Sequence, residues 1–407
     1  MCNGTIMDKL ISFSIPLMLS GILQLMFNAV DIVVVGRFSG SQALAAVGST
    51  TALINVFTNL FIGISLGANV LAARYYAAGK TKEMSETVHT AIALALVSGV
   101  AMAVIGVVFA RGALEIMGTP DDVIAKSTLY MRIYFCGMPF FMMYNYGAAI
   151  LRAVGDTKRP LIFLIVSGVI NAVLNLFLVI VFHLDVAGVG IATVISQLVS
   201  CILVLRCLHH TESSYQLHLA KLRIRSVYLK QIFEVGVPAG IQSTVINISN
   251  AMLQSSVNSF GSIAMAGYTA SNNIFGFLYV SVNSFTQACM SFTSQNYGVG
   301  KYKRMDKVLI DCLILSSGIA LVMGGGAYLF GTEILQIYTG DPEVIRCGME
   351  ILSITTVPYF LCGIMDLFPG ALRGMGCSAV PMILSVIGTV GTRIVWIFGI
   401  FPQFFYC

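Results

Sequence analysis

A short polar stripe near the N-terminus is the feature of the sequence best suited to chemistry. Gln24, Asn28 and Asp31 lie four and three residues apart, so a helix places all three on one face. In a desolvated pocket, such a carboxyl group can trade a proton or a sodium ion for a cationic ligand. We therefore predict a cation-coupling site at Asp31. The alternative is a carboxylate that is simply solvated at the end of its helix.

Asn171 and Asn175 form a second pair with helical spacing. Their amide oxygens suit a hard cation such as sodium, because such cations prefer oxygen ligands. We expect these two residues to join Asp31 at the cation site. The alternative role is structural, since asparagines in apolar helices commonly form hydrogen bonds to neighbouring helices.

Polar residues recur in further apolar segments, at helical spacings. Asp366 precedes Arg373 by seven residues, just as Asn145 precedes Arg152. Asp366 is the second carboxylate candidate, and an ion pair with Arg373 or Arg393 is the alternative for it. The candidate substrate-cleft residues are Asn145, Ser243, Asn247, Asn250, Gln254, Asn283, Gln287 and Asp366.

The composition indicates what must position these residues. Of 407 residues, 57% are hydrophobic and 10% are charged, against about 25% charged in an average soluble domain. The mean hydropathy is +0.87, and a net charge of +5 is too modest to suggest a nucleic-acid partner. The uncharged stretches are about 20 residues long, as membrane-spanning helices are, and longer than barrel strands. We therefore predict an all-α integral membrane protein surrounded by lipid.

Eleven spans follow from the uncharged stretches. The first is too long for a signal peptide and contains Asp31, so we expect it to stay attached as a membrane helix. A turn at Ser259–Gly261 divides the long run between Gly236 and Gly300 into two spans. The predicted spans are 10–35, 44–73, 87–109, 127–150, 160–183, 187–207, 232–258, 264–296, 308–330, 345–368 and 380–401.

Lys and Arg predict the orientation. With a cytoplasmic N-terminus, seventeen of the 23 lie in inner loops and four in outer loops, which is a clear positive-inside bias. We expect a multi-pass protein of the cell (cytoplasmic) membrane with its N-terminus in the cytoplasm. The segment 209–230 mixes basic residues with leucines, so we expect it to lie on the anionic cytoplasmic leaflet.

The two halves of the sequence are related. Ala78–Met84 (AGKTKEM) matches Val299–Met305 (VGKYKRM), and Ile150–Gly155 (ILRAVG) matches Ala371–Gly376 (ALRGMG), both 221 residues later. A repeat of six helices enters the membrane twice from the same side, so the copies are parallel. We predict an N-terminal lobe at 1–208, a cytoplasmic connector at 209–230, and a C-terminal lobe at 231–407 that contains five helices.

Two like bundles suit alternating access, so the repeat favours a secondary transporter. The sequence lacks the GxxxxGK[ST] loop of ATP-driven proteins. It also lacks CxxC and HExxH motifs, so we expect no enzyme, no cofactor and no metal beyond a sodium ion. The alternative is a flippase for a lipid-linked saccharide or other lipid-like substrate, which should line its cleft with several Arg or Lys to hold phosphates.

Motifs along nearly the whole chain resemble the multidrug and toxic compound extrusion (MATE) family. They include Asn28–Gly48 (NAVDIVVVGRFSGSQALAAVG), Leu151–Pro160 (LRAVGDTKRP), Val186–Gln197 (VAGVGIATVISQ) and Ser294–Met305 (SQNYGVGKYKRM). The resemblance implies a monomeric antiporter that expels small cationic, amphipathic drugs in exchange for sodium ions or protons. Such relatives have twelve helices, so this chain is expected to lack the last one.

The resemblance also bears on the cation site. Members of the family place their cation-coupling acid at the position of Asp31. The proton-coupled prokaryotic branch has an Asp where this chain has Val179, and the sodium-coupled branch has a Glu near Ile246 and Asn247. Neither branch pattern is complete here, so the coupling ion stays open between sodium and the proton.

Overall fold

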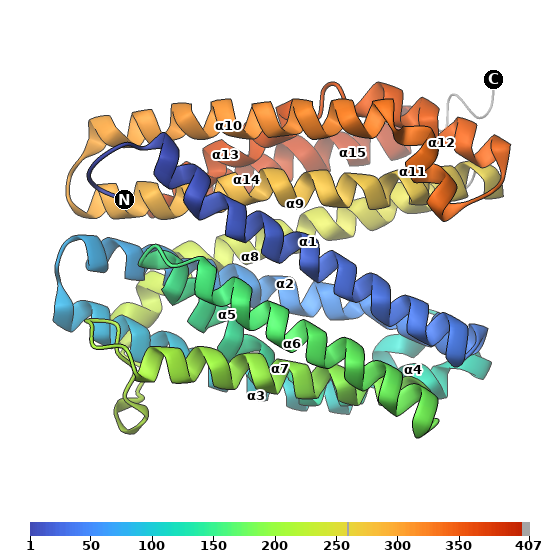
Figure 1. Ribbon diagram of the computed structural model, residues 1–407, viewed down its shortest axis with the longest axis horizontal. Coiled ribbons are helices and arrows are strands. Elements are labelled where there is room, and N and C mark those ends of the chain that lie inside the picture. The colour runs from blue at the N-terminus through green and yellow to red at the C-terminus, as the bar shows by residue number, and fades with distance from the viewer. Residues whose placement is uncertain (259, 401–407) are drawn as a thin grey trace. The chain divides into compact units, whose positions relative to one another are not determined.

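A computed structural model describes residues 1–258 and 260–400 of the chain. Every regular element in these residues is a helix, which confirms the predicted all-α class (Figure 1). The chain divides into two compact units, Leu23–Gly240 and Met1–Ile22 with Ile241–Cys407. Ser259 of the predicted turn and residue 401 of the last predicted span lie outside the described residues.

The unit Leu23–Gly240 is a bundle of long helices. Within it, α3 packs on α4 and α5, and α7 packs on α4, α5 and α6. Its core includes Met131, Met142 and Tyr146, which are almost fully buried. A π-helical turn at Phe177–Val181 extends α6. The helices are α1 (Met7–Phe38), which begins in the other unit, α2 (Ser41–Ala77), α3 (Thr81–Ile116), α4 (Asp121–Cys136), α5 (Met138–Ala153), α6 (Lys158–Leu176) and α7 (Asp185–His209).

The other unit is built around α9, which packs on α10, α12 and α13. The start of α1 belongs to it, and the rings of Phe13 and Phe292 meet edge to face with centroids 5.6 Å apart. π-Helical segments at Val386–Gly391 and Trp396–Ile400 flank α15. The helices are α8 (Ser226–Asn258), which begins in the first unit, α9 (Ser262–Gly298), α10 (Tyr302–Leu329), α11 (Gly331–Tyr338), α12 (Pro342–Thr355), α13 (Phe360–Gly374), α14 (Ala379–Ser385) and α15 (Thr392–Val395).

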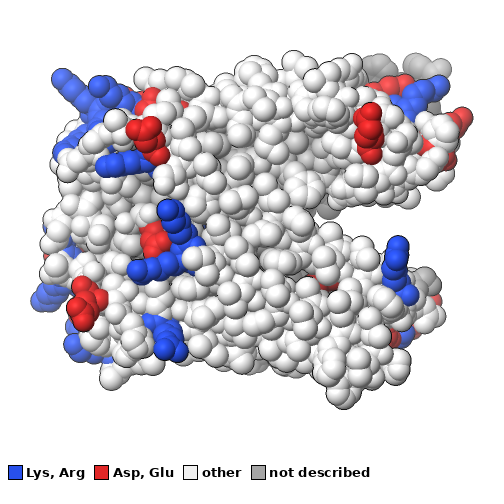
Figure 2. All heavy atoms as spheres, viewed as in Figure 1, with Lys and Arg blue, Asp and Glu red and all other residues white. Residues whose placement is uncertain are grey.

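Seven helices in the described residues are long and apolar enough to cross a membrane, or eight if the bent pair of α12 and α13 is one span. On the face that Figure 2 shows, charged side chains gather toward the ends of the helices, and the middle of each unit is almost free of them. This distribution fits helices that cross an apolar layer, because charges are expensive at its centre.

Two predicted spans are broken in the structure. The span 127–150 divides at Gly137 into α4 and α5, where Pro139 lies in the first turn of α5 and has no N–H to donate. The span 345–368 bends by 54° between Thr355 and Phe360, and Pro358 lies in this break. Proline therefore explains where both predicted spans depart from one straight helix.

Glycines bring α2 and α8 into backbone contact within the unit Leu23–Gly240. A Cβ on Gly67 would lie 2.1 Å from the carbonyl oxygen of Ile232, and a Cβ on Gly236 would lie 2.5 Å from the Cα of Ile64. Neither distance leaves room for a side chain. Close packing through small residues is the usual way in which helices associate in lipid, where no hydrophobic effect drives them together.

Candidate functional site

Helices α1 and α6 approach closely at Gly168. The ring of Phe27 covers this glycine, and a Cβ there would lie 1.9 Å from Phe27 Cε2. Asn171 and Asn175 follow Gly168 by three and seven residues and share its face of α6, while Asp31 follows Phe27 by four residues on α1. The absence of a side chain at residue 168 therefore lets polar groups of the two helices meet.

A polar cluster forms where these helices meet. Asp31 Oδ1 accepts a hydrogen bond from Asn175 Nδ2. Asn175 Nδ2 also lies 3.2 Å from Asn171 Oδ1, and Asn171 Nδ2 lies 3.5 Å from Thr193 Oγ1 on α7. Asn171 is 6% exposed and Asn175 is 0% exposed. We call Asp31, Asn171 and Asn175 the Asp31 cluster.

The Asp31 cluster contains more acceptor capacity than its own hydrogen bonds use. Asn175 Oδ1 is buried and has no hydrogen-bond partner. Such an orphaned acceptor costs about 1–3 kcal/mol unless a ligand or water satisfies it. No Lys or Arg in the described residues forms an ion pair with Asp31. A carboxylate without a fixed counter-ion, beside an unsatisfied amide oxygen, suits a hard monovalent cation.

Gln24 and Asn28 complete the predicted stripe on α1, and their side chains are exposed. The hydrogen bonds of the Asp31 cluster run from α1 to α6 rather than along α1 to these two residues. Asp31 itself is half-buried. The structure thus brings Asp31, Asn171 and Asn175 together. Gln24 and Asn28, the other two predicted cation-coupling residues, lie on α1 with Asp31 but outside this cluster.

Arg393 lies on α15 in the other unit and contacts a candidate cleft residue. Its Nη1 donates to Asn250 Oδ1 at 2.6 Å and to Ser249 Oγ at 3.2 Å. A guanidinium in an apolar helix needs a carboxylate or carbonyl oxygens nearby. The Asn250 amide oxygen provides this contact without neutralising the charge.

The remaining candidate cleft residues make contacts along their own helices. Asn247 Nδ2 donates to the Ser243 carbonyl oxygen at 2.9 Å, and Gln287 Nε2 donates to Asn283 Oδ1 at 3.0 Å. In the unit Leu23–Gly240, Asn145 Nδ2 donates to the Phe141 carbonyl oxygen at 2.8 Å. Gln254 is half-buried on α8. These local bonds orient the side chains of Asn145, Asn247 and Gln287.

Asp366 is half-buried on α13. The alternative role considered for it, an ion pair with Arg373 or Arg393, is not found among the described residues. Arg373 Nη2 instead donates to Gln242 Oε1 at 2.6 Å, and Gln242 Nε2 donates to Ser385 Oγ at 2.7 Å. Arg373 is therefore held by a neutral amide oxygen and not by the carboxylate of Asp366.

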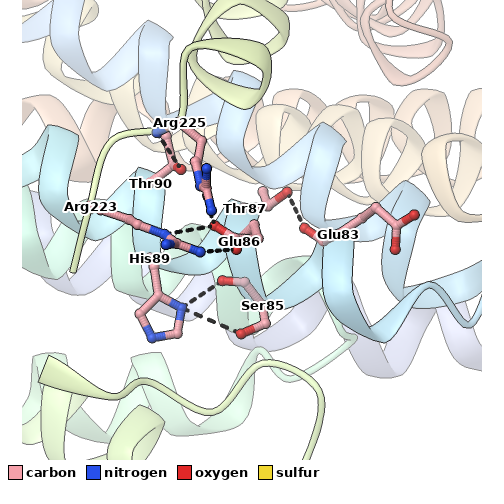
Figure 3. Close-up of polar contacts among 8 residues, drawn as sticks. All are labelled: Glu83, Ser85, Glu86, Thr87, His89, Thr90, Arg223 and Arg225. Carbon is pink, nitrogen blue, oxygen red and sulfur yellow. Dashed lines mark hydrogen bonds and ion pairs between the residues drawn. The ribbon is translucent and has the colours of Figure 1, made fainter. Parts of the chain in front are cut away.

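An ionic contact that the sequence did not predict lies at the start of α3. Glu86 accepts hydrogen bonds from Arg223 Nε at 3.3 Å and from Arg225 Nε at 3.2 Å (Figure 3). The basic composition of residues 209–230 was a visible signal. Glu86 could not be recognised as the partner of these basic residues, because it lies 137 residues before Arg223 and 139 residues before Arg225.

A family model identifies the family to which this chain belongs. The MatE family model matches residues 16–177 and, a second time, residues 238–398. The chain belongs to the MatE family. The two MatE matches begin 222 residues apart and end 221 residues apart, which is the offset of the internal repeat.

Curated MatE relatives have names that refer to drugs. "Probable multidrug resistance protein YoeA" of Bacillus subtilis (strain 168) is 30% identical over 389 residues, which cover 94% of this chain and 84% of that protein. "Multidrug export protein MepA" of Staphylococcus haemolyticus (strain JCSC1435) is 22% identical, with 95% and 86% covered. The MatE family comprises multidrug efflux transporters, so this chain is a transporter and not an enzyme.

Solved MatE structures share the fold. "Outward-facing conformation of a multidrug resistance MATE family transporter of the MOP superfamily" matches with a TM-score of 0.90 at 20% identity, over 97% of this chain and 89% of that chain. A MOP superfamily transporter from Pyrococcus furiosus, which is described as having a binding pocket of reverse polarity, gives the same TM-score, identity and coverage.

Proposed function

We propose that this chain is a secondary active antiporter that exports cationic amphipathic drugs or toxic organic compounds in exchange for sodium ions or protons. The observation that carries the proposal is the Asp31 cluster. It combines a carboxylate that has no Lys or Arg partner in the described residues with the buried, unsatisfied Oδ1 of Asn175. Because no Lys or Arg side chain in the described part of the chain neutralises the carboxylate, the site can bind and release a cation.

Exchange follows from the electrostatics of the proposed site. One bound cation neutralises the carboxylate of Asp31, whereas a second bound cation would leave a net positive charge in a medium of low dielectric constant. A proton, a sodium ion and the cationic group of a drug therefore compete for binding to Asp31. Asn171 and Asn175 would supply amide oxygens to a sodium ion, and Gln24 and Asn28 would guide the ion along the exposed face of α1.

We propose the other polar residues as the lining of the substrate path, with Asp366 as a second attractive charge for cationic groups. The names of YoeA and MepA, which refer to multidrug resistance and multidrug export, support a drug-like substrate. A flippase for phosphate-bearing lipids is not favoured, because the site that carries the proposal is acidic.

The proposed topology has eleven spans in two parallel lobes, with the N-terminus in the cytoplasm. Each predicted span overlaps a single helix or a run of consecutive helical segments. The double match of the family model supports two copies of one repeat, and the excess of Lys and Arg in the inner loops supports the orientation. The lobes at 1–208 and 231–407, the connector at 209–230 and a monomeric state are part of this proposal.

Ethidium efflux tests the proposal. The protein is expressed in cells that lack competing exporters, and an inward sodium gradient or an inward proton gradient is imposed in turn. We expect ethidium efflux above the empty-vector rate under one of the two gradients, which names the coupling ion. Efflux under neither gradient, from protein present in the membrane, would contradict the proposal.

A further inference from the structure

The connector 209–230 is fastened to the start of α3 by its arginines. Arg223 and Arg225 both bind the carboxylate of Glu86, and Figure 3 shows the two guanidinium groups converging on it. The backbone N–H of Arg225 also donates to Thr90 Oγ1 at 3.3 Å. These contacts fix the course of the connector over α3.

A histidine on α3 provides a second attachment. His89 Nδ1 lies 2.6 Å from the Ser85 carbonyl oxygen, which can only accept, so Nδ1 carries the proton and Nε2 is the acceptor. The backbone N–H of His218 donates to this Nε2 at 3.1 Å. The two imidazole rings stack with centroids 6.2 Å apart. The connector is thus ordered on both sides of residues 219–222.

A pocket of about 570 Å³ lies between α3 and this fastened segment. Its volume is within the range of small-molecule sites, about 300–1,000 Å³. Helix α3 and the connector both line it. The charged or polar lining residues are Lys82, Ser85, Glu86, His89, Lys221 and Arg223.

The lining of the pocket is positive on balance. Glu86 is its one carboxylate and is already bound by Arg223. Lys82 and Lys221 form no ion pair with a carboxylate in the described residues. Two free ammonium groups near a guanidinium suit a phosphate group.

Exposed apolar side chains accompany the basic residues of the connector. Leu219 is 57% exposed, Ile224 is 40% exposed, and Val227, at the start of α8, is 66% exposed. Basic residues interleaved with exposed apolar ones are typical of segments that lie at the surface of a bilayer. A ligand for this region should therefore combine a phosphate with hydrocarbon.

We propose that the pocket between α3 and the connector binds the phosphate headgroup of an anionic phospholipid. Lys82 and Lys221 bind the phosphate oxygens, and Leu219 and Ile224 contact the acyl chains. The assignment of this lipid to the cytoplasmic leaflet depends on the proposed orientation, but binding itself depends on neither the orientation nor the transport activity.

Lipid retention by the full chain in detergent, measured by native mass spectrometry, tests this site. The probes are phosphatidylglycerol, phosphatidylcholine with the same acyl chains, and inorganic phosphate as a competitor. We expect preferential retention of phosphatidylglycerol. In Lys82→Gln/Lys221→Gln the preference should fall roughly thirtyfold, since each Lys near an anionic surface contributes about a fivefold attraction. The double variant Lys82→Arg/Lys221→Arg should keep it.

The control is Lys303→Gln/Lys307→Gln, which removes the same charge from exposed positions on α10. If this control lost the preference for phosphatidylglycerol to the same extent, the effect would come from net charge in general, and the proposed site would be overturned. Equal retention of both lipids by the wild type would overturn it as well. Displacement of phosphatidylglycerol by inorganic phosphate at millimolar concentration would overturn the lipid assignment in favour of a soluble phosphate.

Discussion

At the scale of single residues, the Asp31 cluster raises the question of whether its asparagines are ligands or only connect helices. An interhelical hydrogen bond in a membrane protein contributes about 0.6 kcal/mol on average, which is about a threefold effect. An amide oxygen that ligates the coupling ion would have a larger effect on ion affinity. Asn175 distinguishes the two roles because its Nδ2 bonds to Asp31 while its Oδ1 is unsatisfied.

Asn175→Leu should raise the ion concentration for half-maximal drug transport by at least about tenfold, more than a purely structural asparagine would explain. The assay is ethidium transport by proteoliposomes at varied sodium concentration and pH. Asn59→Leu is the matched control, because Asn59 Nδ2 donates to the carbonyl oxygen of Asn55 on its own helix, at 2.7 Å. Identical ion dependence in the two variants would assign Asn175 a structural role.

The sequence predicted which residues share a helix face, but not which faces meet. Spacing places Asn171 and Asn175 on one side of α6, and the structure shows that this side reaches Asp31 through the gap at Gly168. Side-chain spacing contains no information about a partner helix that is more than a hundred residues away. The same limit explains why the contact between Glu86 and Arg223 was missed.

At the scale of helices, the cluster depends on the contact between α1 and α6. Gly168→Ala would place a Cβ 1.9 Å from the Phe27 ring, so the helices must separate or the ring must move. We expect a loss of stability of about 1–3 kcal/mol, as for other overpacked sites, together with weaker transport. Thermal unfolding in detergent measures the first effect.

Gly48→Ala on α2 is the control for this variant, because a Cβ there meets no atom of a neighbouring helix within 4 Å in the described part of the chain. The double variant Gly168→Ala/Phe27→Leu should recover part of the lost stability, since the smaller side chain leaves more room. If Gly168→Ala and Gly48→Ala unfold at the same temperature, the close contact between α1 and α6 at Gly168 does not contribute to stability.

The connector offers a separate test at this scale. His89→Ala removes the acceptor of the His218 N–H, so amide hydrogen exchange in residues 212–225 should accelerate severalfold. His210→Ala is the control, because His210 Nδ1 lies 3.0 Å from the Arg206 carbonyl oxygen, one turn earlier. Unchanged exchange in His89→Ala would mean that the arginine contacts alone fix the connector.

The sequence predicted where helices lie, but it did not predict where two of the expected spans break. An uncharged stretch sets the length of an apolar segment, and α1, α3 and α9 each cover one predicted span. It does not show where the backbone loses a hydrogen bond. The break at Gly137 and the bend before Phe360 lie beside prolines, whose positions were visible but whose effect depends on how neighbouring helices satisfy the freed carbonyl groups.

At the scale of the whole molecule, the repeat and the loop charges predict the sidedness of the membrane protein. Cysteines introduced as Lys303→Cys and Glu343→Cys are treated with a membrane-impermeant maleimide in intact cells, and the labelled peptides are identified by mass spectrometry. We expect label at residue 343 and none at residue 303 until the cells are opened. The reverse pattern would place the N-terminus outside.

In the proposed mechanism, Asp31 couples drug export to an ion. Asp31→Asn keeps the shape of the side chain and removes its charge, and Asp8→Asn changes an exposed carboxylate at the start of the same helix. The measurement is ethidium efflux from cells with equal amounts of each protein in the membrane, under the gradient that drives the wild type. We expect Asp31→Asn to abolish gradient-driven efflux and Asp8→Asn to retain it. Efflux at the wild-type rate in Asp31→Asn would remove Asp31 from the mechanism.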